Sequence, residues 1–373
     1  MKINKPPMGW NSWNTFAENI DEQLILDSAD ALIEKGLLDA GYNYVVIDDC
    51  WALRERGKDG KIVPDPKKFP NGMRSLADKL HAKGLKFGMY SCSGLMTCAQ
   101  YPSSLDREWI DAQSFAEWGV DFLKYDYCYR PANRKGEESY RAMGLALANS
   151  GRDILFSACS WGADKTHEWI RTTGADMWRS TGDIFDNWNS IKSLIEQQFD
   201  RLPFGGKGCF NDMDMLVIGM HGKGHVGLGG CTETEYKTHF AAWCMLQSPL
   251  MIGCDLRSAD DFTLSLLKNS VLIGIDQDEK CAQTYRLGGD EAPVLVRALE
   301  NGDVAIGLFN LADGEKHAWL TLNDIGIGVN SGKTLELTDC WTGEKSIVKN
   351  GYVGSRLAPH SSIVYRGKIV DAK

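Results

Sequence analysis

Short apolar segments alternate with helical patterns over the first 256 residues of the chain. Helical periodicity is clear in residues 21–35 and in residues 73–83, the latter ending before Gly84. Repeated strand and helix patterns of this kind predict a (β/α)8 TIM barrel, with an open doubly wound sheet as the alternative. The eight apolar segments are MGWNSW (8–13), YVVIDDCW (44–51), FGMYSC (87–92), FLKYDYC (122–128), ILFSACSW (154–161), DMWRSTGD (176–183), CFNDMDM (209–215) and PLMIGCDL (249–256).

Beyond residue 277 the pattern changes to short alternating strands separated by turn residues. Such a run predicts a C-terminal antiparallel β-sandwich domain. We therefore expect a catalytic barrel over residues 1–280 and a β-sandwich of structural role over residues 281–373. The strand segments are VLVRAL, DVAIGLF, HAWLTL, TLELTDCW, KSIVKNGYV and SSIVYRG.

Length and charge narrow the range of functions. With 373 residues the chain exceeds the size at which one core keeps growing, which agrees with two domains. The net charge of -9 offers no basic surface for nucleic acid, and no apolar run is long enough for a membrane helix. This charge leaves a neutral small ligand open as partner, and we expect no nucleic acid, no membrane, and a homodimer as the commonest closed assembly.

The N-terminal residues contain no apolar segment of a signal peptide, which predicts a cytoplasmic location unless a leader has been removed. The eleven cysteines form no CxxC motif, so we interpret most of them as reduced core residues. His221 and His225 in HGKGH lack a nearby carboxylate or cysteine that would complete a metal site. We interpret HGKGH as a glycine-rich surface loop and expect neither a metal nor a cofactor.

The residues that close the eight apolar segments are rich in carboxylates and aromatic rings. In a TIM barrel these positions form the active site. Carboxylates with tryptophans and a lysine, but no histidine, argue against a Ser-His triad and suit a sugar, with a magnesium site as the alternative. The set comprises Trp13, Asp48, Asp49, Trp51, Tyr90, Lys124, Asp126, Ser160, Trp161, Arg179, Asp183, Asp212, Asp214 and Asp255.

Glycoside hydrolysis requires one ionised and one protonated carboxyl group. Lys124 precedes Asp126 by two positions, so in a strand both side chains share a face and the ammonium should lower the pKa of Asp126. Asp126 is thus the candidate nucleophile. Asp183, after Arg179, is the candidate general acid/base if partial burial lets it hold a proton. The alternative for each carboxylate is an ordinary helix cap.

Taken together, MGWNSW, IDDCW, LKYDYC, CSW, WRSTGDI, NDMDMLVIG and PLMIGCDL resemble the family 27 glycoside hydrolases, which include α-galactosidases and α-N-acetylgalactosaminidases. The resemblance implies a (β/α)8 barrel with a C-terminal β-domain, retention of anomeric configuration and no cofactor. It also implies Asp126 as nucleophile and Asp183 as acid/base. The sugar contacts it implies are Asp48, Asp49, Trp13, Tyr90, Lys124, Arg179, Asp214 and Met215, with Cys98 and Trp161 at the pocket wall.

One departure concerns the sugar specificity. Where α-galactosidases commonly have glutamate and a bulkier residue, this chain has Ser160 and Ala163, as in the α-N-acetylgalactosaminidase branch, although Asp164 replaces a frequent tyrosine. A serine can donate to an acetyl carbonyl, and an alanine leaves space for its methyl group. We therefore expect an α-N-acetylgalactosaminidase. The alternatives are an α-galactosidase, a β-L-arabinopyranosidase, or a sugar-binding module without activity.

The cysteines follow the resemblance only in part. Cys98 and Cys128 match a pair that is bridged in secreted relatives, whereas Cys50 and Cys159 have lost their partners. The lost bridges favour a reducing compartment, in which Cys98 and Cys128 could be free thiols.

Overall fold

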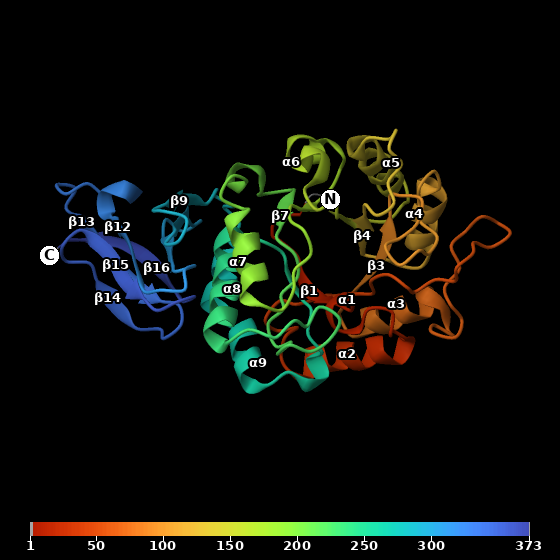
Figure 1. The fold of residues 1–373 in the computed structure, drawn as a ribbon, viewed down its shortest axis with the longest axis horizontal. Helices are drawn as coiled ribbons and strands as arrows, with labels where there is room; N and C mark the ends of the chain where they lie inside the picture. Colours follow the sequence, from red (N-terminus) through yellow and green to blue (C-terminus); the bar gives the residue numbers. More distant parts are fainter. Residues whose placement is uncertain (1–2, 373) are drawn as a thin grey trace.

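Eight parallel strands form the first sheet of the computed structural model, which describes residues 3–372 (Figure 1). They pair in the order β7-β6-β5-β4-β3-β2-β1-β8, and a bridge between Leu216 and Ile252 joins the two ends. The sheet is therefore a (β/α)8 barrel, as the sequence predicts, and not an open doubly wound sheet. Its strands are β1 (Met8–Asn11), β2 (Tyr44–Val46), β3 (Lys86–Cys92), β4 (Phe122–Asp126), β5 (Leu155–Ala158), β6 (Met177–Arg179), β7 (Phe210–Asp212) and β8 (Leu250–Ile252).

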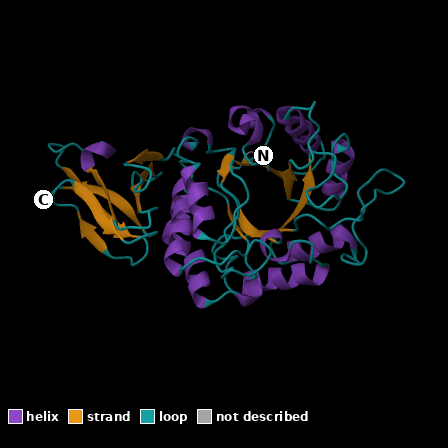
Figure 2. Cartoon of the chain, viewed as in Figure 1, coloured by secondary structure: helices purple, strands orange, loops and turns teal. Residues whose placement is uncertain are grey.

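Helices surround the barrel strands (Figure 2). The predicted helices over residues 21–35 and 73–83 correspond to α2 and α3, and the Asp21 side chain caps α2 by accepting from the Leu24 amide (2.8 Å). Buried Ile25, Ala29 and Leu32 form the inner face of α2. The helices are α1 (Trp13–Phe16), α2 (Glu22–Glu34), α3 (Gly72–Ala82), α4 (Glu108–Glu117), α5 (Gly136–Ala148), α6 (Thr166–Trp169), α7 (Trp188–Glu196), α8 (Glu233–Leu246), α9 (Asp261–Leu267) and α10 (Ser270–Asp276), with 3-10 turns η1 (Ala163–Lys165), η2 (Ile170–Thr172), η3 (Leu202–Phe204) and η4 (Leu256–Ser258).

The barrel strands end earlier than the apolar segments. Cys50, Trp161 and Asp214 have positive φ angles (71°, 57° and 84°), a conformation that cannot continue a strand. The backbone amides beyond the strands bind side-chain carboxylates instead, as the Cys50 amide does with Asp49 Oδ1 (2.7 Å). The polar ends of the segments therefore lie in loops at the carboxyl end of the barrel, where side chains from different strands converge.

The C-terminal domain consists of a six-stranded sheet, ordered β14-β13-β16-β11-β10-β9, and a two-stranded sheet of β12 and β15. All pairings are antiparallel, as predicted for a β-sandwich. The segment KSIVKNGYV is two strands rather than one, because Gly351 (φ 68°) turns the chain between them. The elements are β9 (Tyr285–Leu287), β10 (Val294–Ala298), β11 (Val304–Phe309), β12 (Lys316–Thr321), η5 (Leu322–Ile325), β13 (Lys333–Asp339), β14 (Lys345–Ile347), β15 (Tyr352–Leu357) and β16 (Ser362–Asp371).

Helix α8 connects the two domains. Its Thr238 hydroxyl donates to the His360 carbonyl (2.7 Å), and the Thr284 hydroxyl donates to the carbonyl of Met245 in α8 (2.7 Å). The expected domain boundary at residue 280 falls between α10 and β9. Within residues 3–372, no helix is long and apolar enough to cross a membrane.

Candidate active site

A cavity of about 140 Å³ lies at the carboxyl end of the barrel strands. The structure brings twelve of the sequence-predicted site residues together around it, although they come from segments as far apart as Trp13 and Met215. These twelve are Trp13, Asp48, Asp49, Tyr90, Cys98, Lys124, Asp126, Trp161, Arg179, Asp183, Asp214 and Met215.

Ser160 and Ala163, which we expected to contact the acetamido group, do not line this cavity. Ser160 is fully buried, and its hydroxyl shares a 2.6 Å hydrogen bond with the hydroxyl of Thr166. Ala163 begins the turn η1, two residues after Trp161, which does line the cavity. The expected hydrogen bond from Ser160 to an acetyl carbonyl is therefore absent from this arrangement, because the hydroxyl is already engaged.

Three other residues from the predicted set also lie outside the cavity lining. The Trp51 indole donates to the Tyr90 carbonyl (2.9 Å) and so supports the wall from behind. Asp212 accepts from the Asp214 amide (2.9 Å), and Asp255 pairs with Arg257 (2.8 Å). Each of these three side chains holds a loop in place. A polar residue at a strand end can have this structural role instead of contacting a ligand.

Sequence reasoning missed five lining residues. His225 belongs to HGKGH, which we interpreted as a surface loop, yet its ring packs edge-on against Trp13 with centroids 5.2 Å apart. Its backbone amide donates to the Thr15 carbonyl (3.2 Å), which brings the loop back over the end of β1. The glycines of that loop were the available sequence signal, because they let the chain fold back towards the barrel. The missed residues are Asn14, Ile184, Phe185, His225 and Val226.

Buried Asp48 and partly buried Lys124 form an ion pair on the cavity floor. The Lys124 ammonium donates to Asp48 Oδ2 (2.8 Å), to which the Asn11 amide also donates (2.8 Å). Neighbouring Asp48 and Asp126 raise the pKa of Lys124 despite its burial, so the lysine stays charged. Asp49 is also buried, and its Oδ2 accepts from the Ala99 amide (2.9 Å). The floor thus presents two carboxylates and one ammonium to a polar ligand.

Asp126 stands at the end of β4 with its two oxygens held in place. The Tyr90 hydroxyl donates to Oδ2 (3.1 Å) and the Tyr127 amide donates to Oδ1 (2.8 Å). Burial raises the pKa of Asp126 to about 6, although nearby Lys124 acts in the opposite direction. Lys124 lowers the pKa of Asp126 as expected, but the net shift is upward because desolvation outweighs an ammonium that is bonded to Asp48.

Asp183 lies on the loop after β6 and is 65% exposed. Arg179 donates to its Oδ1 (2.8 Å) and also pairs with buried Asp214 (2.6 Å). Burial acts to raise the pKa of Asp183, but the Arg179 guanidinium outweighs it, and the pKa lies below its ordinary value. The expectation that Asp183 holds a proton through burial is not met, because the guanidinium outweighs burial. Burial raises the pKa of neighbouring Asp214 to about 7, so among these three carboxyl groups Asp183 has the lowest pKa.

Cys98 and Cys128 form a disulfide, so the alternative of two free thiols at the pocket wall is wrong. The Tyr90 hydroxyl lies 3.4 Å from Cys98 Sγ, which places the bridge beside the hydrogen bond to Asp126. The bridge also removes the thiolates that could have made a metal site of Cys98, Cys128 and Asp126. The other nine cysteines in the described chain form no disulfide, and seven of them are buried.

Comparison with known proteins identifies the family. A family model described as "Alpha galactosidase A" matches residues 5–278, and one described as "Alpha galactosidase C-terminal beta sandwich domain" matches residues 289–366. The chain belongs to the α-galactosidase A family, the family 27 glycoside hydrolases. It is therefore a glycoside hydrolase.

Relatives of this family cover almost the whole chain. The α-galactosidase of Coffea arabica is 42% identical over 365 residues, spanning 96% of this chain and 93% of its own length. The α-galactosidase of Cyamopsis tetragonoloba is 39% identical, spanning 96% of this chain and 85% of its own. Among solved structures, α-galactosidase I from Mortierella vinacea is 33% identical with a TM-score of 0.91, and the match covers 99% of this chain and 98% of that one.

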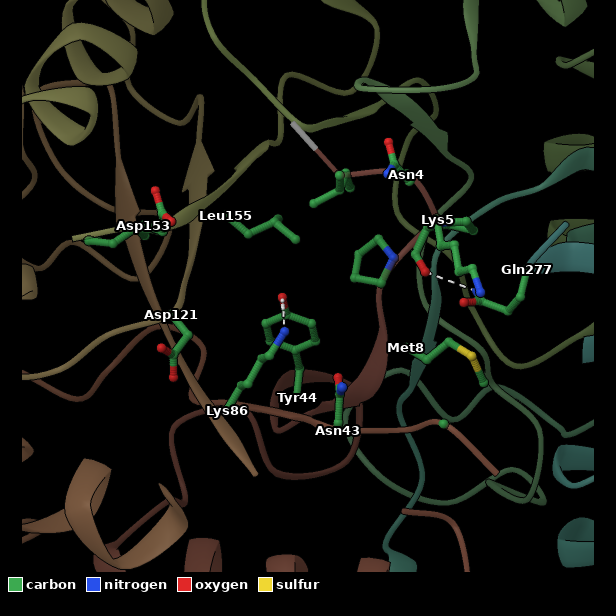
Figure 3. Close-up of a pocket in the computed structure, with 15 residues that line it drawn as sticks. Asn4, Lys5, Met8, Asn43, Tyr44, Lys86, Asp121, Asp153, Leu155 and Gln277 are labelled. Atoms are coloured by element: carbon green, nitrogen blue, oxygen red, sulfur yellow. Dashed lines mark hydrogen bonds between the residues drawn. The ribbon is translucent and has the colours of Figure 1, made fainter. Parts of the chain in front are cut away.

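A second, larger cavity of about 590 Å³ lies at the opposite end of the family 27 barrel (Figure 3). The starts of β2 and β3 line it: Lys86 donates to the Tyr44 hydroxyl (3.3 Å), and its ammonium lies over the Tyr44 ring. Asp121, which also lines it, is held by Arg152 and by the Phe87 amide. The side chains that line this larger cavity thus bond to one another at the amino end of the barrel, whereas Asp126 and Asp183 line the smaller cavity.

Proposed function

We propose that this protein is a retaining exo-glycosidase that releases terminal α-linked galactose, with Asp126 as nucleophile and Asp183 as general acid/base. The observation that carries the proposal is the contrast between two carboxyl groups of one cavity. Asp126 is buried and fixed by Tyr90 and Tyr127, whereas Asp183 is exposed at the mouth and bonded only to a guanidinium among the described side chains. A nucleophile needs the first environment and a proton donor to a leaving group needs the second.

In the first step an Asp126 oxygen attacks the anomeric carbon while the glycosidic bond breaks. The Asp183 proton moves to the departing oxygen, so the aglycone leaves as a neutral alcohol and the sugar stays as an ester on Asp126. In the second step ionised Asp183 accepts a proton from water, which attacks the same carbon and releases Asp126. Two displacements restore the original configuration, so we expect the two carboxyl groups about 5 to 5.5 Å apart.

Substrate binding prepares the proton for this first step. The pKa of Asp126, raised by burial to about 6, lies above that of Asp183, which Arg179 lowers, so Asp126 takes up a proton at a higher pH than Asp183 does. A sugar over the mouth excludes water from Asp183, and loss of solvation raises the pKa of a carboxyl group. The proton then moves to Asp183, and Asp126 becomes the ionised nucleophile.

The cavity floor suits a sugar with several hydroxyl groups on one side. Asp48 and Asp49 supply acceptors, Lys124 supplies a donor, and the Trp13 indole supplies an apolar face. We assign galactose rather than N-acetylgalactosamine because the Ser160 hydroxyl is engaged with Thr166 and lies outside the cavity lining. Relatives about 40% identical that carry the name α-galactosidase support the same assignment.

N-acetylgalactosamine is the second candidate sugar, and a specific observation favours it. No carboxylate stands at position 160 to accept from a 2-hydroxyl group, because the residue there is Ser160. Comparing kcat/KM for matched aryl α-galactoside and aryl α-N-acetylgalactosaminide decides between them. We expect the galactoside to be cleaved faster. A tenfold preference for the acetamido sugar would overturn the galactose assignment and leave the catalytic roles unchanged.

A further inference from the structure

The two-stranded sheet of β12 and β15 in the C-terminal domain has one buried face and one exposed face. Ala318, Leu320 and Val353 on these strands pack in the domain core. Because side chains alternate along a strand, the residues between them face the solvent. Trp319 is one of these and is 49% exposed, although a tryptophan side chain is on average highly buried.

Three rings on this exposed face contact one another. The Tyr352 ring stacks beside Trp319, with centroids 5.8 Å apart and planes 27° apart, and its hydroxyl shares a 2.6 Å hydrogen bond with His317 Nε2. Gly354 pairs with Trp319 across the two strands, and a Cβ atom there would overlap the Tyr352 hydroxyl. The glycine therefore leaves the space in which the Tyr352 ring lies. We name Trp319, Tyr352 and His317 the aromatic platform.

Polar groups stand at the edge of the platform, and their charges are paired. Arg356 pairs with His317 across the strands, and its guanidinium forms an exposed ion pair with Glu315 (3.3 Å). The edge thus offers hydrogen-bond donors and acceptors without a net charge from this pair. A sugar ring matches both features, because its apolar face stacks on an indole while its neutral hydroxyl groups bond to charged side chains.

A groove of about 1020 Å³ begins at one end of the platform. Thr321, which pairs with Tyr352, lines this groove together with Gly351. Two lysines and two acidic side chains also line it, so their charges balance, and Lys333 is paired with Asp371. The groove therefore offers a neutral, hydrogen-bonding course for further units of a chain whose first sugar lies on the platform.

We propose that the aromatic platform is a non-catalytic binding site for a neutral polysaccharide, with one sugar ring on Trp319 and the chain continuing along the groove. A protein partner would have to cover the exposed ion pair between Arg356 and Glu315, and charged residues are depleted in the core of protein interfaces. Figure 1 shows β12 and β15 in the domain beside the barrel, so the site is separate from the catalytic cavity. The inference goes beyond the proposed function, since this binding requires no catalysis.

The test is affinity gel electrophoresis with galactomannan in the native gel. Asp126→Ala in every protein prevents hydrolysis of the polymer during the run. We expect galactomannan to retard the protein, and Trp319→Ala to weaken this binding by about fivefold or more. The matched control is Trp109→Ala, because Trp109 is 58% exposed but lies on α4 of the barrel. Equal retardation of the two tryptophan variants, or no retardation of the parent protein, would overturn the platform proposal.

Further measurements separate the platform from the fold and from catalysis. Gly354→Ala, which displaces the Tyr352 ring, should also weaken binding to galactomannan with the unfolding midpoint of the barrel unchanged. With Asp126 intact, Trp319→Ala should keep kcat/KM on an aryl α-galactoside within about twofold, because Trp319 does not line the catalytic cavity. A loss of aryl galactoside hydrolysis as large as the loss of binding would show that Trp319 acts through the fold, against the proposal. Absence of hydrolysis in the parent enzyme would instead contradict the proposed function.

Discussion

The Lys124 ammonium donates to Asp48 Oδ2 at 2.8 Å at the cavity floor, where Asp48 is buried and the Lys124 side chain is 16% exposed. Removing one member of a buried pair leaves an uncompensated charge. Lys124→Met should therefore lower the free energy of unfolding by about 3 kcal/mol, measured by urea denaturation. The control is Lys61→Met, which breaks an exposed pair with Glu117 (3.1 Å) and should cost less than about 1 kcal/mol. Equal losses in the two variants would show that the floor pair has no special role.

The pH dependence of kcat/KM follows from the single proton shared by Asp126 and Asp183. The form with one proton on this pair is populated between the lowered pKa of Asp183 and the value of about 6 for Asp126, and Asp214, whose pKa burial raises to about 7, loses its own proton on the same side of the profile. Above about pH 6 the free enzyme loses the proton that the leaving group requires, so kcat/KM should fall as pH rises. A pH profile on an aryl galactoside with a poor leaving group measures this limb. A flat profile between pH 5 and about 8 would contradict the shared-proton account.

Asp183→Asn should reverse the sign of this dependence. The variant needs no proton for a good leaving group, so only ionised Asp126 limits the first step. The negative charge of Asp183 raises the pKa of Asp126. Its loss should therefore move the inflection of the pH profile below 6. On an activated aryl galactoside, kcat/KM should therefore rise with pH. If it still falls above pH 6, a different group controls the limb.

Substitution with alanine separates the two roles. Asp126→Ala should lose turnover on all galactosides, by several orders of magnitude in kcat, because no ester can form. Asp183→Ala should lose far less on an activated aryl galactoside than on one with a poor leaving group. The measurement is kcat/KM for both variants on both substrates. Equal losses on the two substrates for Asp183→Ala would exclude it as the proton donor.

The bridge between Cys98 and Cys128 should stabilise the catalytic face. The two cysteines are 30 residues apart in the sequence, and the chain entropy removed by closing a loop of this length predicts a stabilisation of about 3 to 4 kcal/mol. Cys98→Ser with Cys128→Ser should lower stability by that order, and it should raise KM because the Ala99 amide supports Asp49. Cys231→Ser, at a free cysteine, is the control. An unchanged unfolding midpoint in the double variant would contradict this prediction.

The barrel was predictable because each strand is a buried apolar segment and each segment ends in polar residues. The hydrophobic periodicity and the order of the segments could not locate the strand ends. These ends depend on backbone amides that donate to side-chain carboxylates, as the Cys50 amide does to Asp49. The turn at Gly351, within one alternating segment, was missed for a similar reason, since alternation of polarity continues across it.

The cavity residues were predictable to the extent that they stand at strand ends. Phe185 and His225 were missed because they belong to loops that fold back over the barrel, and this depends on tertiary contacts such as the bond between the His225 amide and Thr15. The pKa shifts could not be predicted from the spacing of Lys124 and Asp126, because burial and the partner Asp48 decide them. Ser160 stands at a strand end, but its hydroxyl faces Thr166.

The most direct test of the account is to trap the covalent intermediate. A fluorinated α-galactoside with a good leaving group should form a galactosyl ester that hydrolyses slowly enough for peptide mapping by mass spectrometry. We expect one sugar per chain, attached to the peptide that contains Asp126, and an α-configured first product by NMR with an ordinary substrate. A label on Asp183, or a β-configured first product, would contradict the assignment of Asp126 as the nucleophile of a retaining enzyme.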